Sequence, residues 1–345
     1  MLNTEFCIDL LEINIKVEND INNHNICVVG AGNWGRNHIR TLHQLNSLGA
    51  VVENDPQAIR FIKEEYPYCN IHTDLISSLN KDYDGFIVAT PPLTHFEIAK
   101  KIIESNKPLL VEKPLTLNVE DAVKLNDLAK KNNVNLMVGH LLLFHPAFNK
   151  ISDLIESGIL GEIQYIYSNR LNLGTFRSEE NVFWSFAPHD ISLFHYFFKI
   201  SPIEITCRGI DILQKGIHDT TITSIKYNGN KMGHIFVSWL HPFKEHRLMV
   251  IGSKGMISFE DSAKNKPLKL YSKSYDLSGE FLAKKDGSVE IIPYSEEMPL
   301  KEELKYFIRH LDGSPLRIAN ADNAVEVVDI LVQASQSLLE GVPIE

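Results

Sequence analysis

The chain has 345 residues, of which 44% are hydrophobic, so it is long enough for two domains that each bury a core. Its formal net charge of −10 argues against a surface that binds nucleic acid or anionic lipid and favours a small-molecule partner. The four cysteines, Cys7, Cys27, Cys69 and Cys207, form no CxxC pair, which fits a reducing compartment better than a disulfide framework or a zinc site.

The first 24 residues precede the first strand-like run. Their opening stretch, MLNTEFCIDLLEIN, is acidic where a secretory signal would be basic, and no apolar run approaches the roughly 20 residues that span a bilayer. We therefore expect a cytoplasmic protein with no membrane partner. Residues 1–24 form an expected N-terminal extension, in which the alternation of Ile13, Ile15 and Val17 would suit an added edge strand or a loose segment.

Residues 25–145 alternate short apolar runs with helical stretches. The strand-like runs are ICVVG, GAVVE, GFIVAT, PLLVE and NLMVG, and the helical stretches include THFEIAKKIIES and NVEDAVKLNDLAKK. Repeated strand–helix units of this kind predict a doubly wound parallel sheet that helices cover on both faces, as in an α/β Rossmann domain.

Residues 146–345 have a different pattern. Strand-like runs dominate it, with turn signals at Asn228-Gly229 and between Gly252 and Gly255; the runs are EIQYIYSNRLN, IEITCRGIDI, TTITSIKYN, KMGHIFVSWL, RLMVIG and MISFED. Two helical stretches, KEELKYFIRHLDG and ADNAVEVVDILVQASQSLLEG, close the chain. This half is predicted to form a second, α+β domain with an antiparallel or mixed sheet.

A glycine-rich segment directly follows the first strand-like run. Gly30, Gly32 and Gly35 make the pattern GxGxxG, with Asn33 and Trp34 before the last glycine. The first glycine permits a tight turn, the second leaves room for a pyrophosphate, and the third lets helix and strand approach. The helix N-terminus also attracts phosphate charge. We therefore predict that these five residues bind a dinucleotide.

An acidic residue ends the second strand-like run. Glu53 closes GAVVE and can accept hydrogen bonds from an adenosine ribose, whereas its carboxylate would repel a 2'-phosphate. Asp55 competes for this role, but Pro56 follows it directly, which is typical of a helix N-cap. We predict NAD, rather than NADP, as the cofactor. A glycine-rich turn that holds no ligand is the alternative.

Two further loops are expected at the carboxyl edge of the same sheet, where doubly wound folds bind ligands. VATPPLTH supplies Thr90, Pro91 and His95 as candidate cofactor contacts, although His95 is more simply a packing or hydrogen-bonding residue at a helix start. LLVEKPLTL places Glu112 and Lys113 near a nicotinamide, before a proline that is compatible with a cis peptide bond. Such a lysine can hydrogen-bond a substrate oxygen, and a solvated strand-end lysine is the alternative.

The order of these motifs resembles the glucose-fructose oxidoreductase / inositol dehydrogenase / MocA family of NAD(P)-dependent dehydrogenases. The resemblance rests on GAGNWG, Glu53, VATPPLTH, VEKP and VGH, and it covers nearly the whole chain beyond residue 25. It implies a Rossmann domain followed by an α+β domain with a large open, mainly antiparallel sheet, a homodimer or homotetramer, and a catalytic site in the cleft between the domains. It also implies that Lys113 and His189 are catalytic.

The chemistry of alcohol oxidation agrees with these two roles. The hydroxyl proton must leave while hydride passes to the nicotinamide, and a histidine, with an ordinary pKa of about 6.5, is a suitable base. We assign this role to His189, while Lys113 would stabilise negative charge on the same oxygen. A helix over HDISLFHYFF would start at His189, and its dipole would lower the pKa of the ring. A buried histidine in an aromatic core is the alternative.

The surroundings of His189 depart from the pattern of many relatives. Where those show DxGxHxxD, this chain has Ser185, Ala187 and Ser192, with Asp190 directly after the histidine. This passage, together with VGHLLLFHPAF and YIYSNRLNLGTFR, resembles a branch that acts on nucleotide sugars, similar to the UDP-N-acetylglucosamine 3-dehydrogenases and the related UDP-N-acetylglucosaminuronate enzymes.

A nucleotide-sugar diphosphate requires cationic or amide donors. Arg170 and Arg177 are candidates for the diphosphate, and Asn169 for a hydroxyl or acetamido group, although each arginine could equally form a surface ion pair. His140, just beyond a strand end, is a candidate to line the cleft. No metal site is expected, because the spacing of five between His140 and His145 is poor for a shared ion and further ligands are missing from the pattern.

These patterns predict an NAD-dependent dehydrogenase that oxidises the 3-hydroxyl of a UDP-N-acetyl-hexosamine, or of its uronate, for amino-sugar and lipopolysaccharide-type surface-glycan synthesis. The alternatives are a dehydrogenase of inositol or a free sugar, and a non-catalytic NAD-binding regulator on the same fold. The presence of both Lys113 and His189 favours an enzyme.

Overall fold

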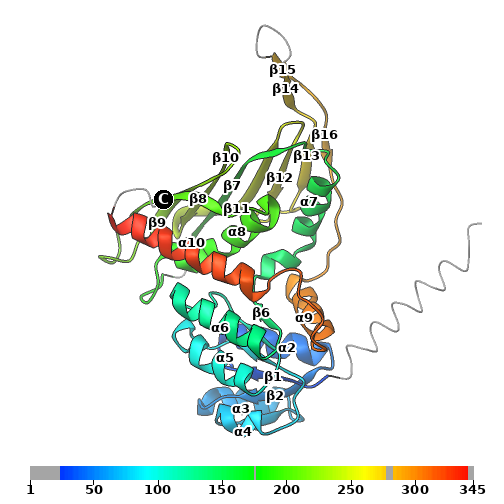
Figure 1. Cartoon of the computed structure of the whole chain (residues 1–345), viewed down its shortest axis with the longest axis vertical. Helices are drawn as coiled ribbons and strands as arrows, with labels where there is room; N and C mark the ends of the chain where they lie inside the picture. Colours follow the sequence, from blue (N-terminus) through cyan, green and yellow to red (C-terminus); the bar gives the residue numbers. More distant parts are fainter. Residues whose placement is uncertain (1–23, 175, 277–282, 341–345) are drawn as a thin grey trace, which may run out of the picture. The chain divides into compact units, whose positions relative to one another are not determined.

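The computed structural model describes residues 24–174, 176–276 and 283–340 (Figure 1). The expected N-terminal extension therefore lies outside the described residues, apart from residue 24. Within the described ranges, no helix is long and apolar enough to cross a membrane.

The chain divides into two compact units. Among the described residues, the first comprises those within 24–139 and 298–325, and the second comprises those within 140–297 and 326–340. The sequence placed a boundary after residue 145 and assigned everything beyond it to one domain, whereas residues 298–325 belong to the first unit in the structure. The pattern of an amphipathic helix indicates that one face is buried, but it does not indicate which unit covers that face.

The first unit contains a parallel sheet with the strand order β3-β2-β1-β4-β5-β6. The strands are β1 Ile26–Val29, β2 Leu48–Val52, β3 Asn70–His72, β4 Gly85–Val88, β5 Leu109–Val111 and β6 Leu136–Val138. The five strand-like runs predict five of them, and the Rossmann fold is confirmed. Strand β3 was missed because its three residues, NIH, contain one apolar side chain.

Helices follow the strands of this unit, as the alternation predicted. They are α2 Asn33–Gln44, α3 Pro56–Glu65, α4 Leu75–Leu79, α5 His95–Glu104, α6 Val119–Lys131 and α9 Pro299–Arg309, with the 3-10 turn η1 Pro92–Thr94 before α5; α10 Ala321–Glu340 begins in this unit and ends in the second. The N-cap predicted at Asp55 is confirmed, since its carboxylate accepts a hydrogen bond of 2.8 Å from the Ala58 N–H.

The segment over residues 298–325 completes this unit. Phe307 of α9 and Leu311 beyond it fill the space beside Gly85, where a Cβ atom would lie 2.6 Å from the Leu311 side chain. The Val138 N–H then donates to the Ala319 carbonyl at 2.8 Å, so the returning chain pairs with the edge of β6. The segment therefore covers both an apolar surface and an edge strand.

The second unit is built on an eight-stranded sheet with the order β16-β13-β12-β11-β7-β10-β9-β8 (Figure 1). Only β10 and β7 pair in parallel, so the predicted mainly antiparallel sheet is confirmed. Its strands are β7 Ile163–Leu173, β8 Pro202–Ile210, β9 Thr220–Tyr227, β10 Lys231–Ser238, β11 Leu240–Gly252, β12 Met256–Glu260, β13 Leu268–Tyr271 and β16 Val289–Ile291. Strands β14 Ser274–Asp276 and β15 Ala283–Lys285 form a separate hairpin.

Three helical segments of the second unit come before and after β7: η2 Leu141–Phe144, α7 Pro146–Glu156 and α8 Val182–Phe198. Helix α8 packs on β7, β9 and β10. It begins at Val182, and the Asn181 side chain caps it by accepting from the Trp184 N–H at 3.1 Å. The expectation that His189 starts a helix is therefore wrong, and with it the argument that a helix N-terminus lowers the pKa of this histidine.

Candidate functional site

The glycine-rich loop joins β1 to α2 as the sequence predicted. Gly30 has φ +95°, and a Cβ atom there would lie 2.9 Å from the Ala89 carbonyl oxygen. At Gly35 a Cβ atom would lie only 2.0 Å from the Gly30 oxygen, so the helix approaches the loop too closely for any side chain. Gly32, by contrast, has open space around its Cβ position and makes no side-chain cap for α2. The loop thus combines room for a ligand with N–H groups at the helix start, which suits a pyrophosphate.

This contrast between two glycines gives a testable prediction. Gly35→Ala is expected to destabilise the fold by more than about 3 kcal/mol, because the added methyl group meets backbone. Gly32→Ala is expected to leave the thermal midpoint within about 2 °C of wild type but to weaken NAD binding at least about tenfold, because the methyl group enters the ligand space. Scanning and titration calorimetry measure the two effects. Unchanged NAD affinity in Gly32→Ala would place the pyrophosphate elsewhere.

Glu53 ends β2 beside the glycine loop. One oxygen of its carboxylate accepts from the Ala31 N–H at 2.8 Å, and the other accepts from the N–H groups of Asn54 and Asp55 at 2.8 and 3.0 Å. The carboxylate is therefore anchored at the rim of the loop while the residue remains half-buried. This is the position in which an acidic residue accepts hydrogen bonds from an adenosine ribose.

His95 connects the loop at Thr90 to the turn at Lys113 and Pro114. The ring is fully buried, with Nδ1 at 2.8 Å from the Pro114 carbonyl oxygen and Nε2 at 2.9 Å from the Thr90 carbonyl oxygen. Burial lowers the pKa of His95, so the neutral ring donates its single N–H to one of the two carbonyls. Of the candidate cofactor contacts, Thr90 is half-buried and Pro91 exposed, whereas His95 holds their loop to the Lys113–Pro114 turn.

A histidine that the sequence analysis missed lies behind Lys113. His38, on the buried face of α2, places Nε2 at 2.7 Å from a carboxylate oxygen of Glu112, directly after β5. The other Glu112 oxygen accepts from the Lys113 N–H at 3.2 Å. Lys113 is half-buried, and the peptide bond to Pro114 is cis. The only signal for His38 was its place on the helix face that also carries Ile39 and Leu42.

In the second unit, Arg170 is part of a buried ion pair. Its Nε and Nη2 donate to the two carboxylate oxygens of Asp190 at 2.8 and 3.0 Å, and the Ser168 hydroxyl donates to the same carboxylate at 2.5 Å. The side chains of Arg170 and Asp190 are 13% and 1% exposed. Asp190, which follows His189 on α8, is thus engaged by strand β7. Burial, followed by the charge of Arg170, lowers the pKa of the neighbouring His246 to about 4.

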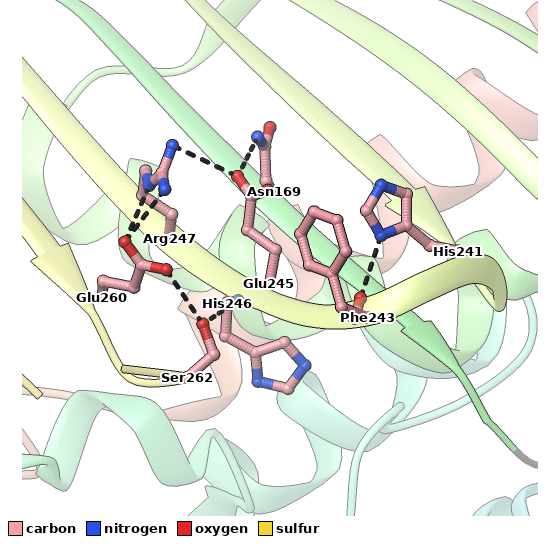
Figure 2. Close-up of polar contacts among 8 residues, drawn as sticks. All are labelled: Asn169, His241, Phe243, Glu245, His246, Arg247, Glu260 and Ser262. Atoms are coloured by element: carbon pink, nitrogen blue, oxygen red, sulfur yellow. Dashed lines mark hydrogen bonds and ion pairs between the residues drawn. The ribbon is translucent and has the colours of Figure 1, made fainter. Parts of the chain in front are cut away.

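Asn169, the neighbour of Arg170 on β7, contacts residues of β11 (Figure 2). Its side-chain amide donates to Glu245 at 2.8 Å, and Arg247 on the same face binds Glu260 at 2.9 Å. Neighbouring residues of a strand point to opposite faces, so Asn169 and Arg170 do not line one pocket. Their contacts with substrate stay a prediction.

The remaining candidates differ in exposure. The Arg177 side chain is 56% exposed and sits 3.8 Å from Glu180, whereas His140 is buried before η2. Asn33 and Trp34 are exposed in the first turn of α2. In the part of the chain that the structure describes, no three histidine, cysteine or acidic side chains are arranged to hold a metal ion.

Comparison with known families agrees with this geometry. A family model described as an oxidoreductase family with an NAD-binding Rossmann fold matches residues 24–140, and a GFO/IDH/MocA C-terminal domain model matches residues 148–258. The fold and the matches define an NAD-dependent oxidoreductase. The chain belongs to the GFO/IDH/MocA family, which confirms the resemblance seen in its motifs and the prediction of NAD as cofactor.

Two relatives match most of the chain at low identity. An uncharacterized oxidoreductase of Streptococcus pneumoniae is 23% identical, and the match covers 91% of this chain and 96% of that protein. The myo-inositol 2-dehydrogenase of Thermotoga maritima is 25% identical with the same coverage. The structure of UDP-N-acetylglucosamine 3-dehydrogenase GnnA from Acidithiobacillus ferrooxidans is 20% identical with a TM-score of 0.81, covering 91% of this chain and 97% of that one. This structural likeness shows the shared fold.

Proposed function

We propose that the protein is an NAD-dependent dehydrogenase that oxidises the 3-hydroxyl of a UDP-N-acetyl-hexosamine, or of its uronate, to a 3-keto sugar nucleotide. The observation that carries the dehydrogenase assignment is the placement of Lys113 at the carboxyl end of β5, on a turn that Glu112 and His95 hold from two sides. The fold shared with a UDP-N-acetylglucosamine 3-dehydrogenase supports the substrate class.

The residues of the first unit fit the cofactor. The N–H groups at the start of α2 and the space at Gly32 would hold the pyrophosphate, and Glu53 would hold the adenosine ribose. Bound NAD would supply the acceptor for hydride. The lysine ammonium of Lys113 would donate a hydrogen bond to the reacting oxygen and stabilise the negative charge that develops there.

The second unit would supply the base and the groups that recognise substrate. His189, in its neutral form, would accept the hydroxyl proton. Arg170 already neutralises Asp190, so Arg177, which is more exposed and more weakly paired, is the stronger candidate for the diphosphate. A cytoplasmic homodimer or homotetramer that feeds amino-sugar synthesis for surface glycans, lipopolysaccharide among them, completes the proposal.

The test follows absorbance at 340 nm with NAD and, separately, UDP-N-acetylglucosamine and its C6 uronate. An aminotransferase with glutamate removes the ketone and draws the reaction forward. NADH formation with either sugar nucleotide is the expected result. No NADH with either, in protein that titration calorimetry shows to bind NAD, would contradict the substrate assignment.

A dehydrogenase of inositol or a free sugar is the second candidate. It is favoured by the likeness to a myo-inositol 2-dehydrogenase over 91% of the chain. The same assay with myo-inositol separates the two, because NADH would then form with the polyol and not with the sugar nucleotides. An NAD-binding regulator would bind the cofactor and oxidise none of these compounds.

A further inference from the structure

Three buried ionisable side chains of the first unit interact through Glu112, the residue before Lys113. His38 lies on α2, Glu112 follows β5, and Glu303 lies on α9, which packs on α2. His38 is fully buried, Glu303 is 1% exposed, and the Glu112 side chain is 12% exposed. Burial of this kind costs free energy unless the groups satisfy one another or stay neutral.

Glu112 links the buried His38 to the turn at Lys113 and Pro114. One carboxylate oxygen accepts from His38 Nε2 at 2.7 Å, and the other accepts from the Lys113 N–H at 3.2 Å. Gly139 leaves the room for this second oxygen, since a Cβ atom there would lie 3.1 Å from it. Burial acts to raise the pKa of Glu112, but the hydrogen bond and charge of His38, and then Lys113, outweigh burial and lower it. Glu112 is thus an anion, and Nε2 of His38 carries a proton.

Glu303 differs from Glu112 in its hydrogen bonding and in the direction in which its pKa is shifted. Its Oε1 is buried without a hydrogen-bond partner among the described residues. Burial, followed by the negative charge of Glu112, raises the pKa of Glu303 well above its ordinary value of 4.5. Ionisation of Glu303 would therefore place a second buried negative charge beside that of Glu112.

We propose that His38 and Glu303 are positioning residues, which together hold the Glu112 carboxylate against the Lys113 N–H and so fix the lysine at the end of β5. Glu303, which is buried and whose Oε1 has no hydrogen-bond partner among the described residues, leaves His38 as the partner of a single carboxylate. The proposal rests on the role proposed above for Lys113, but the orientation of the turn can be measured without substrate and without NAD.

The pH dependence has a definite sign. Because the pKa of Glu303 is higher in the folded than in the unfolded chain, its contribution to stability is complete below about 4.5 and is lost as pH rises toward the raised folded value. Wild-type protein should therefore lose stability with rising pH relative to Glu303→Gln, which cannot ionise. Glu112 is the charged group that acts on Glu303, and His38 and Lys113 are the titratable neighbours of Glu112 in this cluster.

The experiment measures amide hydrogen exchange at Lys113 and the thermal midpoint between pH 5 and pH 9, in NAD-free protein. His38→Leu is expected to speed exchange of the Lys113 N–H about five- to tenfold, because Glu112 loses its anchor. His38→Gln keeps an N–H donor and should restore most of the protection. Glu303→Gln should flatten the pH dependence of the midpoint, whereas Glu302→Gln, a neighbour on α9 that pairs with Lys305 near the surface, should keep the wild-type profile.

Two results would overturn the proposal: unchanged Lys113 exchange in His38→Leu, or a pH profile of Glu303→Gln parallel to that of wild type. If His38→Leu does not fold, the test uses Glu303→Gln alone. The two measurements are then the pH dependence of its thermal midpoint and the amide exchange of its Lys113 N–H. Failure of the proposed function looks different, because Lys113 would remain protected through His38 in a protein that forms no NADH.

Discussion

Replacing Lys113 with methionine is expected to lower the rate of NADH formation by about 10²- to 10⁴-fold while the NAD-binding unit stays folded. Methionine has a similar length but no charge, so the variant removes hydrogen bonding to the reacting oxygen and the stabilisation of its negative charge. This interaction strengthens in the transition state, so the loss should fall on kcat more than on KM. Steady-state kinetics at 340 nm, with NAD affinity from titration calorimetry, separate chemistry from binding.

Lys124→Met is the matched control, because Lys124 is an exposed lysine of the same unit that pairs with Asp121 on the surface of α6. It should keep the wild-type rate. The rate of His189→Gln should also be low. The wild-type rate should fall at low pH because a histidine base becomes protonated, and this fall should be absent in His189→Gln. A Lys113→Met enzyme that turns over at the wild-type rate would remove Lys113 from the mechanism.

Removing Asp190 is expected to produce the second large effect. Asp190→Ala leaves the Arg170 guanidinium buried without its counter-charge, which costs about 3–5 kcal/mol of unfolding free energy. For a unit of this size the thermal midpoint should fall by roughly 10 °C, as measured by scanning calorimetry. The double variant Arg170→Met/Asp190→Leu removes both charges and fills their space with apolar groups, so it should recover most of that loss.

An exposed ion pair of the same unit provides the comparison. Lys199 and Glu156 are each 60% exposed, and Glu156→Ala should change stability by less than about 1 kcal/mol. If Asp190→Ala proved as mild as Glu156→Ala, the guanidinium would have to be hydrated or paired otherwise, and Arg170 would become the stronger candidate for a substrate anion.

The parts of the fold that the sequence predicted well are those with local causes. Gly30 and Gly35 are required by a positive φ and by a close backbone approach, and both requirements recur wherever a strand turns into a phosphate-binding helix. The N-cap at Asp55 followed from a residue type and the proline after it. Short apolar runs identified five parallel strands for the same reason, since burial on both faces leaves a continuous apolar pattern.

The parts that were missed depend on long-range partners. His38 and Glu112 are 74 residues apart, and no local pattern says that a histidine on a helix will meet a carboxylate at a strand end. Glu303 joins them only because α9 returns to the first unit.

The start of α8, however, was predictable from the sequence. Asn181 before an apolar run is an N-cap signal that would have placed the start of α8 correctly. Pro188 obscured it, because a proline inside a helix normally suggests a boundary.

The return of residues 298–325 to the first unit sets the order in which a newly synthesised chain can mature. The ribosome releases β1 to β6 long before it makes α9, so in the interval the surface beside Gly85 and the edge of β6 lack their cover. A fragment that stops near residue 145 has the complete glycine loop but neither Glu303 nor this cover. Such a fragment should aggregate rather than serve as an isolated dinucleotide-binding module, and co-expression of the missing segment should improve its solubility.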